Sequence, residues 1–396
     1  MKRTILYILF SLFLLLLPTG KATANINDSI RLSLLTCAPG KEIYSLFGHT
    51  AIRYENPSQG IDVVFNYGLF SFNTPNFMLR FALGETDYQL GVTDYERFAA
   101  EYAFFDRSVW QQTLCLSNEE KAELVRLLEE NYRPENRIYR YNFFYDNCST
   151  RPRDKIEESI NGKITYPTEP TDDSRTFRDI VHQYCEGHLW ARFGIDLCVG
   201  SEADRPITQR QMMFSPFYLH DAFANAQIVN GNEKKSLVCA TEKIIDVTPD
   251  VEEKGWEPSP LGCSLFLFIL IAAATIYGIR KEKGLWGVDL VLFSLAGIVG
   301  CLLAFLAIFS EHPAVSANYL LFVFHPGQLL FLPYIIYCVR KRKKCWYLTF
   351  NSVVLTLFIV LFWLIPQRID FAVVPLALSL LIRSASNLIL TYNKKQ

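Results

Sequence analysis

Cys148 is the side chain in this sequence whose position best suits nucleophilic chemistry. It lies in the segment NFFYDNCST, and the following residues DNCSTRPRDKIEESING read as a helix, with Pro152 near its start and Gly162 near its end. In the first turn of a helix, a cysteine meets the positive end of the helix dipole and unpaired backbone N–H groups, which favour the thiolate. The same N–H groups can hold the oxyanion that forms when a thiolate attacks a carbonyl. The position favours a nucleophile, although a cysteine in an exported domain more often forms a disulfide.

A nucleophilic cysteine needs a base, normally a histidine, and a polar group that orients the base. His49 lies in the segment LFGHTAIRY, which alternates as a strand does, and residues 61–70 read as the returning strand of a hairpin. A period of two places Asp62 and Asn66 on one face of that strand. The hairpin therefore predicts His49 as the base, oriented by Asn66 or Asp62, against the commoner alternative of a structural histidine.

Other segments predict a mixed α and β domain around these residues. Residues 30–37 and 137–144 read as strands. Residues 117–132 read as a helix that opens with Ser117 and Glu120 at the spacing of a capping box. We expect an α+β domain over residues 25–243, followed by a linker over 244–259 that is acidic and contains two prolines.

The first 24 residues have the form of a secretory signal peptide. Lys2 and Arg3 precede an apolar run from Ile5 to Leu17, and a small-residue Ala-x-Ala site ends at Ala24. The sequence therefore predicts that residues 25–255 are exported. This exported part carries 24 Lys and Arg against 35 Asp and Glu, a net charge of −11, which argues against nucleic acid as a partner.

The composition changes completely after Pro258. Five apolar runs, each near the roughly 20 residues that span a bilayer, cover about 262–279, 285–309, 319–339, 346–365 and 371–391. Clusters of Lys and Arg follow the first, third and fifth runs, and basic loops face the cytoplasm. We therefore expect an all-α transmembrane domain of five helices over residues 260–396, with a cytoplasmic C-terminus.

Two further features limit the chemistry. The exported part has six cysteines, an even number that allows disulfides, and their spacings match no zinc signature, so we expect neither metal nor cofactor. In the membrane part, Glu311 and His312 fall in an outer loop, Asn318 begins the third span and His325 lies deeper within it. Ionisable groups in a span suggest function, so these four residues are candidates for lipid or acceptor binding; the alternative is that they satisfy helix ends shaped by proline.

Long segments of the chain resemble the Lnb family of bacterial lipoprotein N-acyltransferases. They are LLTCAPGKEIYSLFGHTAIRY, DVVFNYGLFSFNTPNF, YRYNFFYDNCSTRPRDKI, FGIDLCVGSEADRPIT, MFSPFYL and EHPAVSANYLLFVFHPGQLL. More distantly, a strand histidine that precedes an Asn-Cys at a helix start is similar to the permuted papain-like enzymes of the NlpC and lecithin:retinol acyltransferase type. That resemblance implies a permuted papain-like fold for the exported domain.

The Lnb resemblance implies an acyl transfer at the bacterial inner membrane, with the catalytic domain on the periplasmic side. Cys148 would take an acyl chain from a membrane phospholipid as a thioester and pass it to the N-terminal amine of a diacylated lipoprotein. His49 would be the base, and Asn66 or Asp62 the third member.

Two other classes of function remain open from the sequence. A cysteine phospholipase or an NlpC-like amidase would differ only in resolving the acyl-enzyme with water. A non-enzymatic assembly or sensor protein, stapled by disulfides and tethered to the membrane, would place Cys148 in a bridge, so the state of this thiol separates it from both enzymes.

Overall fold

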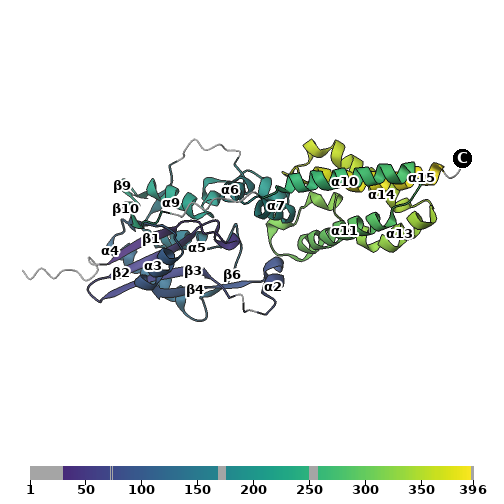
Figure 1. Cartoon of the computed structure of the whole chain (residues 1–396). Coiled ribbons are helices and arrows are strands. Elements are labelled where there is room, and N and C mark those ends of the chain that lie inside the picture. The colour runs from purple at the N-terminus through teal and green to yellow at the C-terminus, as the bar shows by residue number, and fades with distance from the viewer. Residues whose placement is uncertain (1–29, 72, 74, 168–174, 249–256, 394–396) are drawn as a thin grey trace, which may run out of the picture.

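The computed structural model describes residues 30–71, 73, 75–167, 175–248 and 257–393. Figure 1 shows an elongated molecule, with a domain built around a sheet at one end and a bundle of helices at the other. The predicted signal peptide, residues 1–24, lies outside the described residues, as does half of the predicted linker, residues 249–256.

An antiparallel sheet of seven strands, in the order β10-β5-β1-β2-β3-β4-β6, forms the N-terminal domain. The strands are β1 (Arg31–Cys37), β2 (His49–Asn56), β3 (Ile61–Leu69), β4 (Asp87–Asp94), β5 (Val109–Leu114), β6 (Ile138–Arg140) and β10 (Val238–Ile245). The predicted first strand and the hairpin of β2 and β3 are confirmed. Because β10 runs to Ile245, it includes the first two residues of the predicted linker.

Helices cover both faces of this sheet. Side chains of β1 alternate between two cores. Leu34 packs in the larger one with α4 (Asn118–Tyr132) and α5 (Thr150–Ser159), and Leu35 packs in a smaller one with α3 (Tyr95–Phe104). The helices are α2 (Phe77–Leu83), α3 (Tyr95–Phe104), α4 (Asn118–Tyr132), α5 (Thr150–Ser159), α6 (Phe177–Tyr184), α7 (Leu189–Cys198), α8 (Gln209–Met212) and α9 (Pro216–Ala224). The predicted capping box of Ser117 and Glu120 is present at the start of α4.

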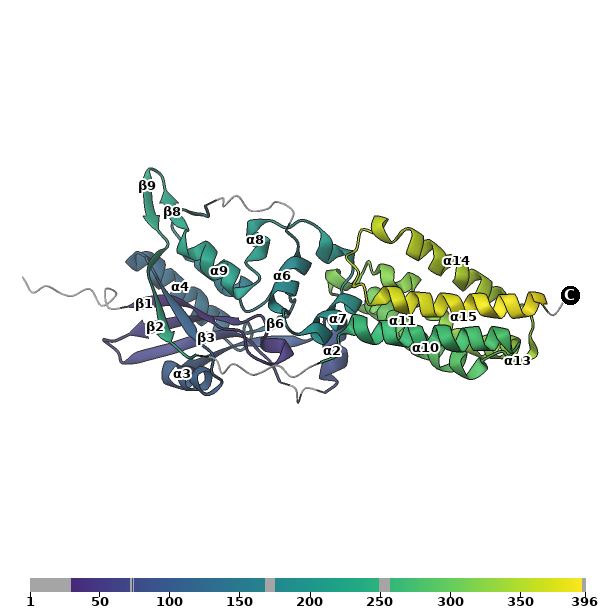
Figure 2. The ribbon, with the colours of Figure 1, turned by 45° about the horizontal axis from the view of Figure 1, so that its top comes forward.

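Short elements complete the domain. They are the 3-10 helices η2 (Ile43–Ser45) and η3 (Ser201–Asp204), and a small sheet of β7 (Lys163–Thr165), β8 (Gln227–Asn230) and β9 (Glu233–Ser236). Figure 2 shows the small sheet at the end of the domain that lies away from the bundle.

Two predictions near Cys148 need correction. The strand predicted over 137–144 ends at Arg140, because the chain then turns back through paired backbone hydrogen bonds of Asn142 and Asp146, each 2.9 Å long. Cys148 does not lie in the first turn of a helix: α5 begins at Thr150 with Ser149 as its N-cap, so Cys148 immediately precedes the cap.

One disulfide joins Cys115, directly after β5, to Cys239 on β10. Cys148 and the three other exported cysteines are free thiols. The domain is therefore stapled at its edge strand, but the bridge does not involve Cys148.

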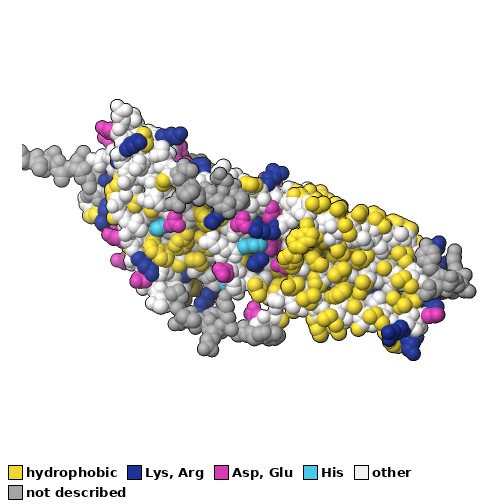
Figure 3. All heavy atoms as spheres, turned by 90° about the horizontal axis from the view of Figure 1, so that it is seen from above, with side chains coloured by type: hydrophobic (Ala, Val, Ile, Leu, Met, Phe, Trp, Pro, Cys, Tyr) yellow, Lys and Arg dark blue, Asp and Glu magenta, His cyan; other side chains and the backbone are white. Residues whose placement is uncertain are grey.

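The C-terminal region contains three helices long and apolar enough to cross a membrane, judged over the described residues. They are α10 (Pro260–Arg280), α11 (Trp286–Phe309) and α15 (Val373–Asn393); α14 (Trp346–Val360) is apolar but shorter. Figure 3 shows that apolar side chains dominate one face of this bundle, with cationic groups at its far end. The region is helical and of membrane type, but the predicted count of five spanning helices is not confirmed.

The third predicted span, 319–339, is not one continuous helix. It divides into η5 (Tyr319–Phe322), α12 (Gly327–Leu330) and α13 (Leu332–Lys341). The break falls at His325-Pro326, where proline lacks a backbone donor and where the backbone of His325 lies against Gly300 of α11. A Cβ on Gly300 would meet that backbone at 2.5 Å, so the close approach requires glycine.

Backbone hydrogen bonds join the two parts of the molecule. The amide of Gly200 donates to the carbonyl of Ala314 (2.7 Å), Ser201 to Ala317 (2.9 Å) and Glu311 to Leu83 (2.8 Å). In the bundle, these bonds involve the loop around η4 (Pro313–Val315). In the sheet domain, they involve the end of α2 and the residues that follow α7. The sheet domain is thus docked on the bundle as well as connected by chain.

Candidate active site

His49 and Asn66 lie together at the end of the sheet that faces the bundle. The imidazole Nε2 of His49 is 2.5 Å from the side-chain oxygen Oδ1 of Asn66. An amide oxygen only accepts, so Nε2 donates to it and Nδ1 remains as the nitrogen available to a thiol. Asn66 therefore fixes both the orientation and the tautomer of the imidazole.

Cys148 is the partner on the other side of His49. Burial alone would raise the pKa of Cys148, but the charge of the His49 imidazolium, its hydrogen bond and donors from Thr50 and Ser149 lower it. Burial alone would lower the pKa of His49, but the charge of the Cys148 thiolate and hydrogen bonds to Cys148 and Asn66 raise it. Each group thus favours the charged form of the other, and both side chains remain partly exposed.

Asn147 shapes the turn that presents Cys148. Its side-chain oxygen accepts from the amides of Ser149 (2.8 Å) and Thr150 (3.0 Å), which would otherwise be unpaired at the start of α5. Its amide nitrogen donates to the carbonyls of Phe143 (2.7 Å) and Phe214 (2.9 Å). The side chain is buried and fully engaged, so its role is to build the turn.

A hydroxyl pair ties this turn to the strand that carries His49. Thr50 Oγ1 lies 3.0 Å from Ser149 Oγ, and both residues are buried. Because Thr50 follows His49 and Ser149 follows Cys148, the contact fixes the separation of His49 and Cys148.

Gly68 opens the space in front of the thiol. Its φ of +87° belongs to the left-handed region that favours glycine, and the pairing of β3 with β4 shifts between Asn66 and Leu69. A Cβ at this position would lie 3.5 Å from the Cβ of Cys148 and 3.9 Å from both His49 Cε1 and the Tyr139 hydroxyl. The glycine therefore marks a point that three functional side chains surround.

Tyr139 brings an unpaired hydroxyl to this point. Its Oη is buried and has no hydrogen-bond partner among the described residues, while Arg151 lies 3.6 Å over its ring. A buried O–H without a partner costs free energy unless a ligand accepts from it. The hydroxyl is thus a donor without an acceptor beside Cys148.

Cys37 is a second cysteine near His49, but burial keeps its thiol protonated. It pairs with His49 across β1 and β2 but is fully buried, and burial raises its pKa to about 12. Such a thiol stays protonated and does not react at neutral pH.

Asp62 lies on the same face of β3 as Asn66, as the period of two predicts, but at the opposite end. The register pairs Asp62 with Glu55, and its carboxylate accepts from Arg53 Nε (2.8 Å) and Nη2 (2.7 Å). Arg53 in turn lies 3.4 Å over the ring of Tyr95. The prediction that Asp62 could orient His49 is therefore wrong, because its charge is paired elsewhere and Asn66 takes that place.

Two family models match the chain. The Lnb N-terminal periplasmic domain matches residues 21–180, and the Lnb transmembrane domain matches residues 251–395. The chain belongs to the Lnb family. No curated protein and no solved structure matches it. The two matches together indicate a membrane protein with a periplasmic N-terminal part. Cys148, His49 and Asn66 all fall within the part matched by the periplasmic domain.

The polar residues predicted in the Lnb transmembrane domain have partners in three different places. Glu311 and His312 dock on α2, where His312 Nε2 lies 3.1 Å from the carbonyl oxygen of Phe81. Asn318 donates to the carbonyl of Leu197 (2.7 Å) and accepts from Leu320, which joins α7 to η5. His325 lies within the bundle, 3.3 Å from the Asn351 oxygen. The structure does not gather these four residues around one site.

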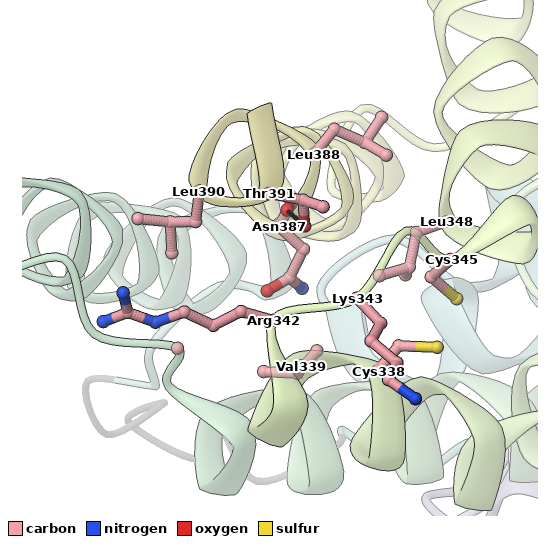
Figure 4. Close-up of a pocket in the computed structure, with 11 residues that line it drawn as sticks. Cys338, Val339, Arg342, Lys343, Cys345, Leu348, Asn387, Leu388, Leu390 and Thr391 are labelled. Atoms are coloured by element: carbon pink, nitrogen blue, oxygen red, sulfur yellow. Dashed lines mark hydrogen bonds between the residues drawn. The ribbon is translucent and has the colours of Figure 1, made fainter. Parts of the chain in front are cut away.

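Neither of two cavities in this Lnb-family chain has Cys148 or His49 in its lining. Figure 4 shows the first, near the cationic end of the bundle, lined by Cys338, Arg342 and Asn387 among others. It holds about 10 Å³, room for about one water. The second, about 690 Å³, opens between α6 and residues 365–368, where Arg368 pairs with Asp179. Within the described residues, no group of three His, Cys, Asp or Glu side chains could hold a metal ion.

Sequence reasoning missed Gly68, Tyr139 and the bond between Thr50 and Ser149. An isolated glycine inside the strand pattern NYGLF is a signal for a bulge or a close approach, and it could have drawn attention to Gly68. No local signal distinguishes Tyr139 from the other aromatics of its segment, because its importance comes from its position across the sheet.

Proposed function

We propose that this Lnb-family chain is a thiol acyltransferase of the membrane. It moves an acyl chain from a phospholipid, through a thioester on Cys148, to the N-terminal amine of a diacylglyceryl-cysteine lipoprotein. The observation that supports this most is the contact of an unbridged Cys148 thiol with a His49 that Asn66 orients. The order of these residues also supports the proposal that the domain is a permuted relative of papain-like enzymes.

The first half-reaction forms the acyl-enzyme. The Cys148 thiolate attacks the carbonyl carbon of the phospholipid ester, and a tetrahedral oxyanion forms beside the Tyr139 hydroxyl, which donates to it. The carbon–oxygen ester bond then breaks, and the His49 imidazolium gives its proton to the departing glycerol oxygen. A lysophospholipid leaves, and the acyl chain stays on sulfur as a thioester.

The second half-reaction transfers the acyl chain to nitrogen. Neutral His49 takes a proton from the α-amine of the acceptor as the amine attacks the thioester carbon. The carbon–nitrogen bond forms, the carbon–sulfur bond breaks, and Cys148 returns as a thiolate beside the imidazolium. The cycle needs only groups that can carry protons, so no metal or cofactor enters it.

The arrangement of the two domains favours substrates held in a bilayer. The sheet domain is docked on one end of the bundle, and the C-terminus lies at the other end (Figure 1). With the sheet domain in the periplasm, we propose that the C-terminus is cytoplasmic and that the protein lies in the inner membrane, next to both lipid substrates.

A test compares acyl-enzyme formation and N-acylation in phospholipid vesicles that contain a diacylated lipoprotein. Cys148→Ala and Cys148→Ser are expected to form no hydroxylamine-labile acyl-protein and no triacylated product. Cys301→Ala is the matched control, since this free cysteine is exposed on α11 and lies outside the site.

The products decide between the possible activities. N-acylated lipoprotein with a stoichiometric lysophospholipid supports the transferase. Free fatty acid at the same rate with and without the acceptor would instead identify a phospholipase, and retained activity in both Cys148 variants would refute the thioester mechanism.

A further inference from the structure

An exposed apolar surface on α2 and η2 lies at the junction of the two domains. On α2, the side chains of Met78, Leu79 and Phe81 are 73%, 50% and 41% exposed; on η2, those of Ile43 and Tyr44 are 63% and 65% exposed. Contiguous apolar surface of this kind on a soluble domain marks a binding or membrane-contact site.

One aromatic side chain connects the two halves of this surface. Phe70 stacks on Phe77 of α2, with ring centroids 5.4 Å apart, and meets Tyr44 of η2 edge-on at 6.2 Å. The two short helices therefore form one surface, although Ser45 at the end of η2 and Phe77 at the start of α2 are 32 positions apart in the sequence.

The surface continues into the apolar exterior of α11. Ile308 and Phe309, at the end of α11, are 71% and 62% exposed, and the next residues dock on α2 through the backbone of Glu311 and the ring of His312. Figure 2 shows α2 beside the end of the bundle. A bilayer around α11 would place its acyl chains directly against α2.

Rings also lead from this surface inward to the thiol. Phe70 lies 5.0 Å from Tyr88, and Tyr88 stacks on Tyr141 at 4.1 Å between centroids. Phe70, Tyr141 and Cys148 pack against the same core as Tyr88. Tyr88 also pairs with Tyr139 across β4 and β6, and the Tyr139 hydroxyl and the Cβ of Cys148 both border Gly68. An apolar wall thus runs from the end of α11 to Cys148.

We propose that α2 and η2 form a lipid-entry surface: their apolar side chains lie among the acyl chains of the outer leaflet beside α11 and guide a phospholipid towards Cys148. The last step, delivery to the thiol, rests on the proposed acyltransferase function. The contact with lipid does not, because it follows from the exposed surface and its continuity with α11. An amphipathic element at the interface binds lipid by burying apolar side chains in this way.

The first experiment measures lipid contact without any need for activity. The photoreactive amino acid benzoylphenylalanine replaces Met78 in the full chain, in vesicles of phosphatidylethanolamine and phosphatidylglycerol, and adducts are identified by mass spectrometry after illumination. The control position is Ile61, which is exposed at the opposite end of the hairpin of β2 and β3. A phospholipid adduct at position 78 but not at 61 is expected; cross-linking to a second copy, or equal lipid adducts at both positions, would overturn the proposal.

The second experiment measures delivery to Cys148. The double variant Met78→Asp/Leu79→Asp is expected to form acyl-enzyme from vesicle phospholipid at least about tenfold more slowly, because charge is costly among acyl chains, and Ile61→Asp is expected to keep the unmodified rate. Resistance of the fully buried Cys37 thiol to iodoacetamide reports that each variant is folded. A double variant that is folded and acylated at the full rate would overturn guidance by this surface.

The two proposals fail in different ways. If the unmodified chain forms no acyl-enzyme at all, the proposed acyltransferase function fails while lipid adducts at position 78 still support the surface. If acyl-enzyme forms but position 78 gives no lipid adduct, the surface proposal fails while the acyltransferase stands.

Discussion

The sheet domain and the helical bundle each enclose a cluster of polar side chains, and the two clusters are completed in opposite ways. In the bundle, Arg383 pairs with both carboxylate oxygens of Asp289 (2.7 and 3.1 Å) and also donates to Thr275, while Asn387 contacts the same carboxylate. All four side chains are buried. In the sheet domain, Cys148 is partly exposed and the Tyr139 hydroxyl lacks a partner among the described residues. A buried cluster whose donors and acceptors are all paired stabilises the packing of its helices. A cluster with an unpaired donor can still form a hydrogen bond with a substrate.

The largest effect is expected from removing the proposed base, His49, from the incomplete cluster of the sheet domain. His49→Ala is expected to slow acyl-enzyme formation about 10²–10⁴-fold, the usual contribution of a positioned acid–base group, without loss of folded protein. The measurement is the rate of acyl-protein formation from vesicle phospholipid. His220→Ala is the control, since the described side-chain contacts of this histidine are with Asp221 and Phe217 and do not include Cys148, Asn66 or Tyr139. A fully active His49→Ala variant would place the base elsewhere.

The second prediction concerns the cluster in the bundle, whose polar side chains are all paired with one another. Arg383→Met leaves the carboxylate of Asp289 buried without its partner, and we expect a loss of about 3–5 kcal/mol in the free energy of unfolding. Thermal unfolding in detergent micelles measures this loss. The double variant Arg383→Met/Asp289→Leu is expected to recover most of the stability; a single variant as stable as the unmodified protein would show that the ion pair does not hold the bundle.

Tyr139→Phe tests whether the unpaired hydroxyl serves the reaction. Loss of an oxyanion donor typically slows a reaction about 10²–10³-fold, and we expect that effect on acyl-enzyme formation. We expect no loss of stability, because none of the residues that the structure describes pairs with this hydroxyl. Tyr67→Phe is the matched control: its hydroxyl donates to Asn131 (2.8 Å), so it should lose about 1 kcal/mol of stability and keep its rate. Equal rates in both variants would remove Tyr139 from the mechanism.

The pH dependence sharpens the contrast between the two thiols of Cys148 and Cys37. The pKa of Cys148 is lowered, so its thiolate persists to lower pH than a free thiol, and the pKa of His49 is raised, so its imidazolium persists to higher pH than a free imidazole. Acyl-enzyme formation should therefore show a broad optimum between these two limits. In His49→Gln, the charge and hydrogen bond of His49 are lost while burial and the donors from Thr50 and Ser149 remain, so the pKa of Cys148 rises and the midpoint of its alkylation by iodoacetamide should move to higher pH. An unchanged midpoint would contradict the pairing.

The smallest effect is expected for Asp62→Asn. This carboxylate is partly exposed and pairs with Arg53, and such pairs contribute about 0.2–1 kcal/mol. We expect a loss of stability within that range, measured by denaturant unfolding, and an unchanged rate of acyl-enzyme formation. Asn66→Ala in parallel should slow the reaction, since Asn66 orients the imidazole; the reverse ranking would restore Asp62 as the orienting group.

The sequence singled out Cys148 and His49, which the structure brings together, because both positions depend on local signals. Alternation marks the hairpin that carries His49, and the order of aromatic segment, Asn-Cys and helix marks Cys148. The choice between Asp62 and Asn66 could not be made in the same way. Both share a face by the period of two, and only the register, which pairs Asp62 with Glu55, separates them along the strand.

The rest of the fold depends on contacts between distant segments. The order of strands in the sheet, with β10 beside β5, is set by pairing across more than a hundred residues and has no local pattern. In the bundle, the hydropathy of residues 319–339 fits a span, but Pro326 and the close approach of Gly300 to His325 divide it. Hydropathy measures composition, and it does not record where a backbone must bend to pack.

The main-chain hydrogen bonds at the junction of the two domains fix the distance between Cys148 and the membrane-type helices. Because Gly200, Ser201 and Glu311 donate through their amides to carbonyl oxygens, most side-chain substitutions leave these bonds in place. The distance of Cys148 from the candidate spanning helices is then set by the backbone and depends little on the side chains at the junction. If the proposed acyl transfer takes place, this fixed height determines how far the ester bond of a phospholipid must leave the bilayer to reach the sulfur, and the enzyme could select its donor by that depth.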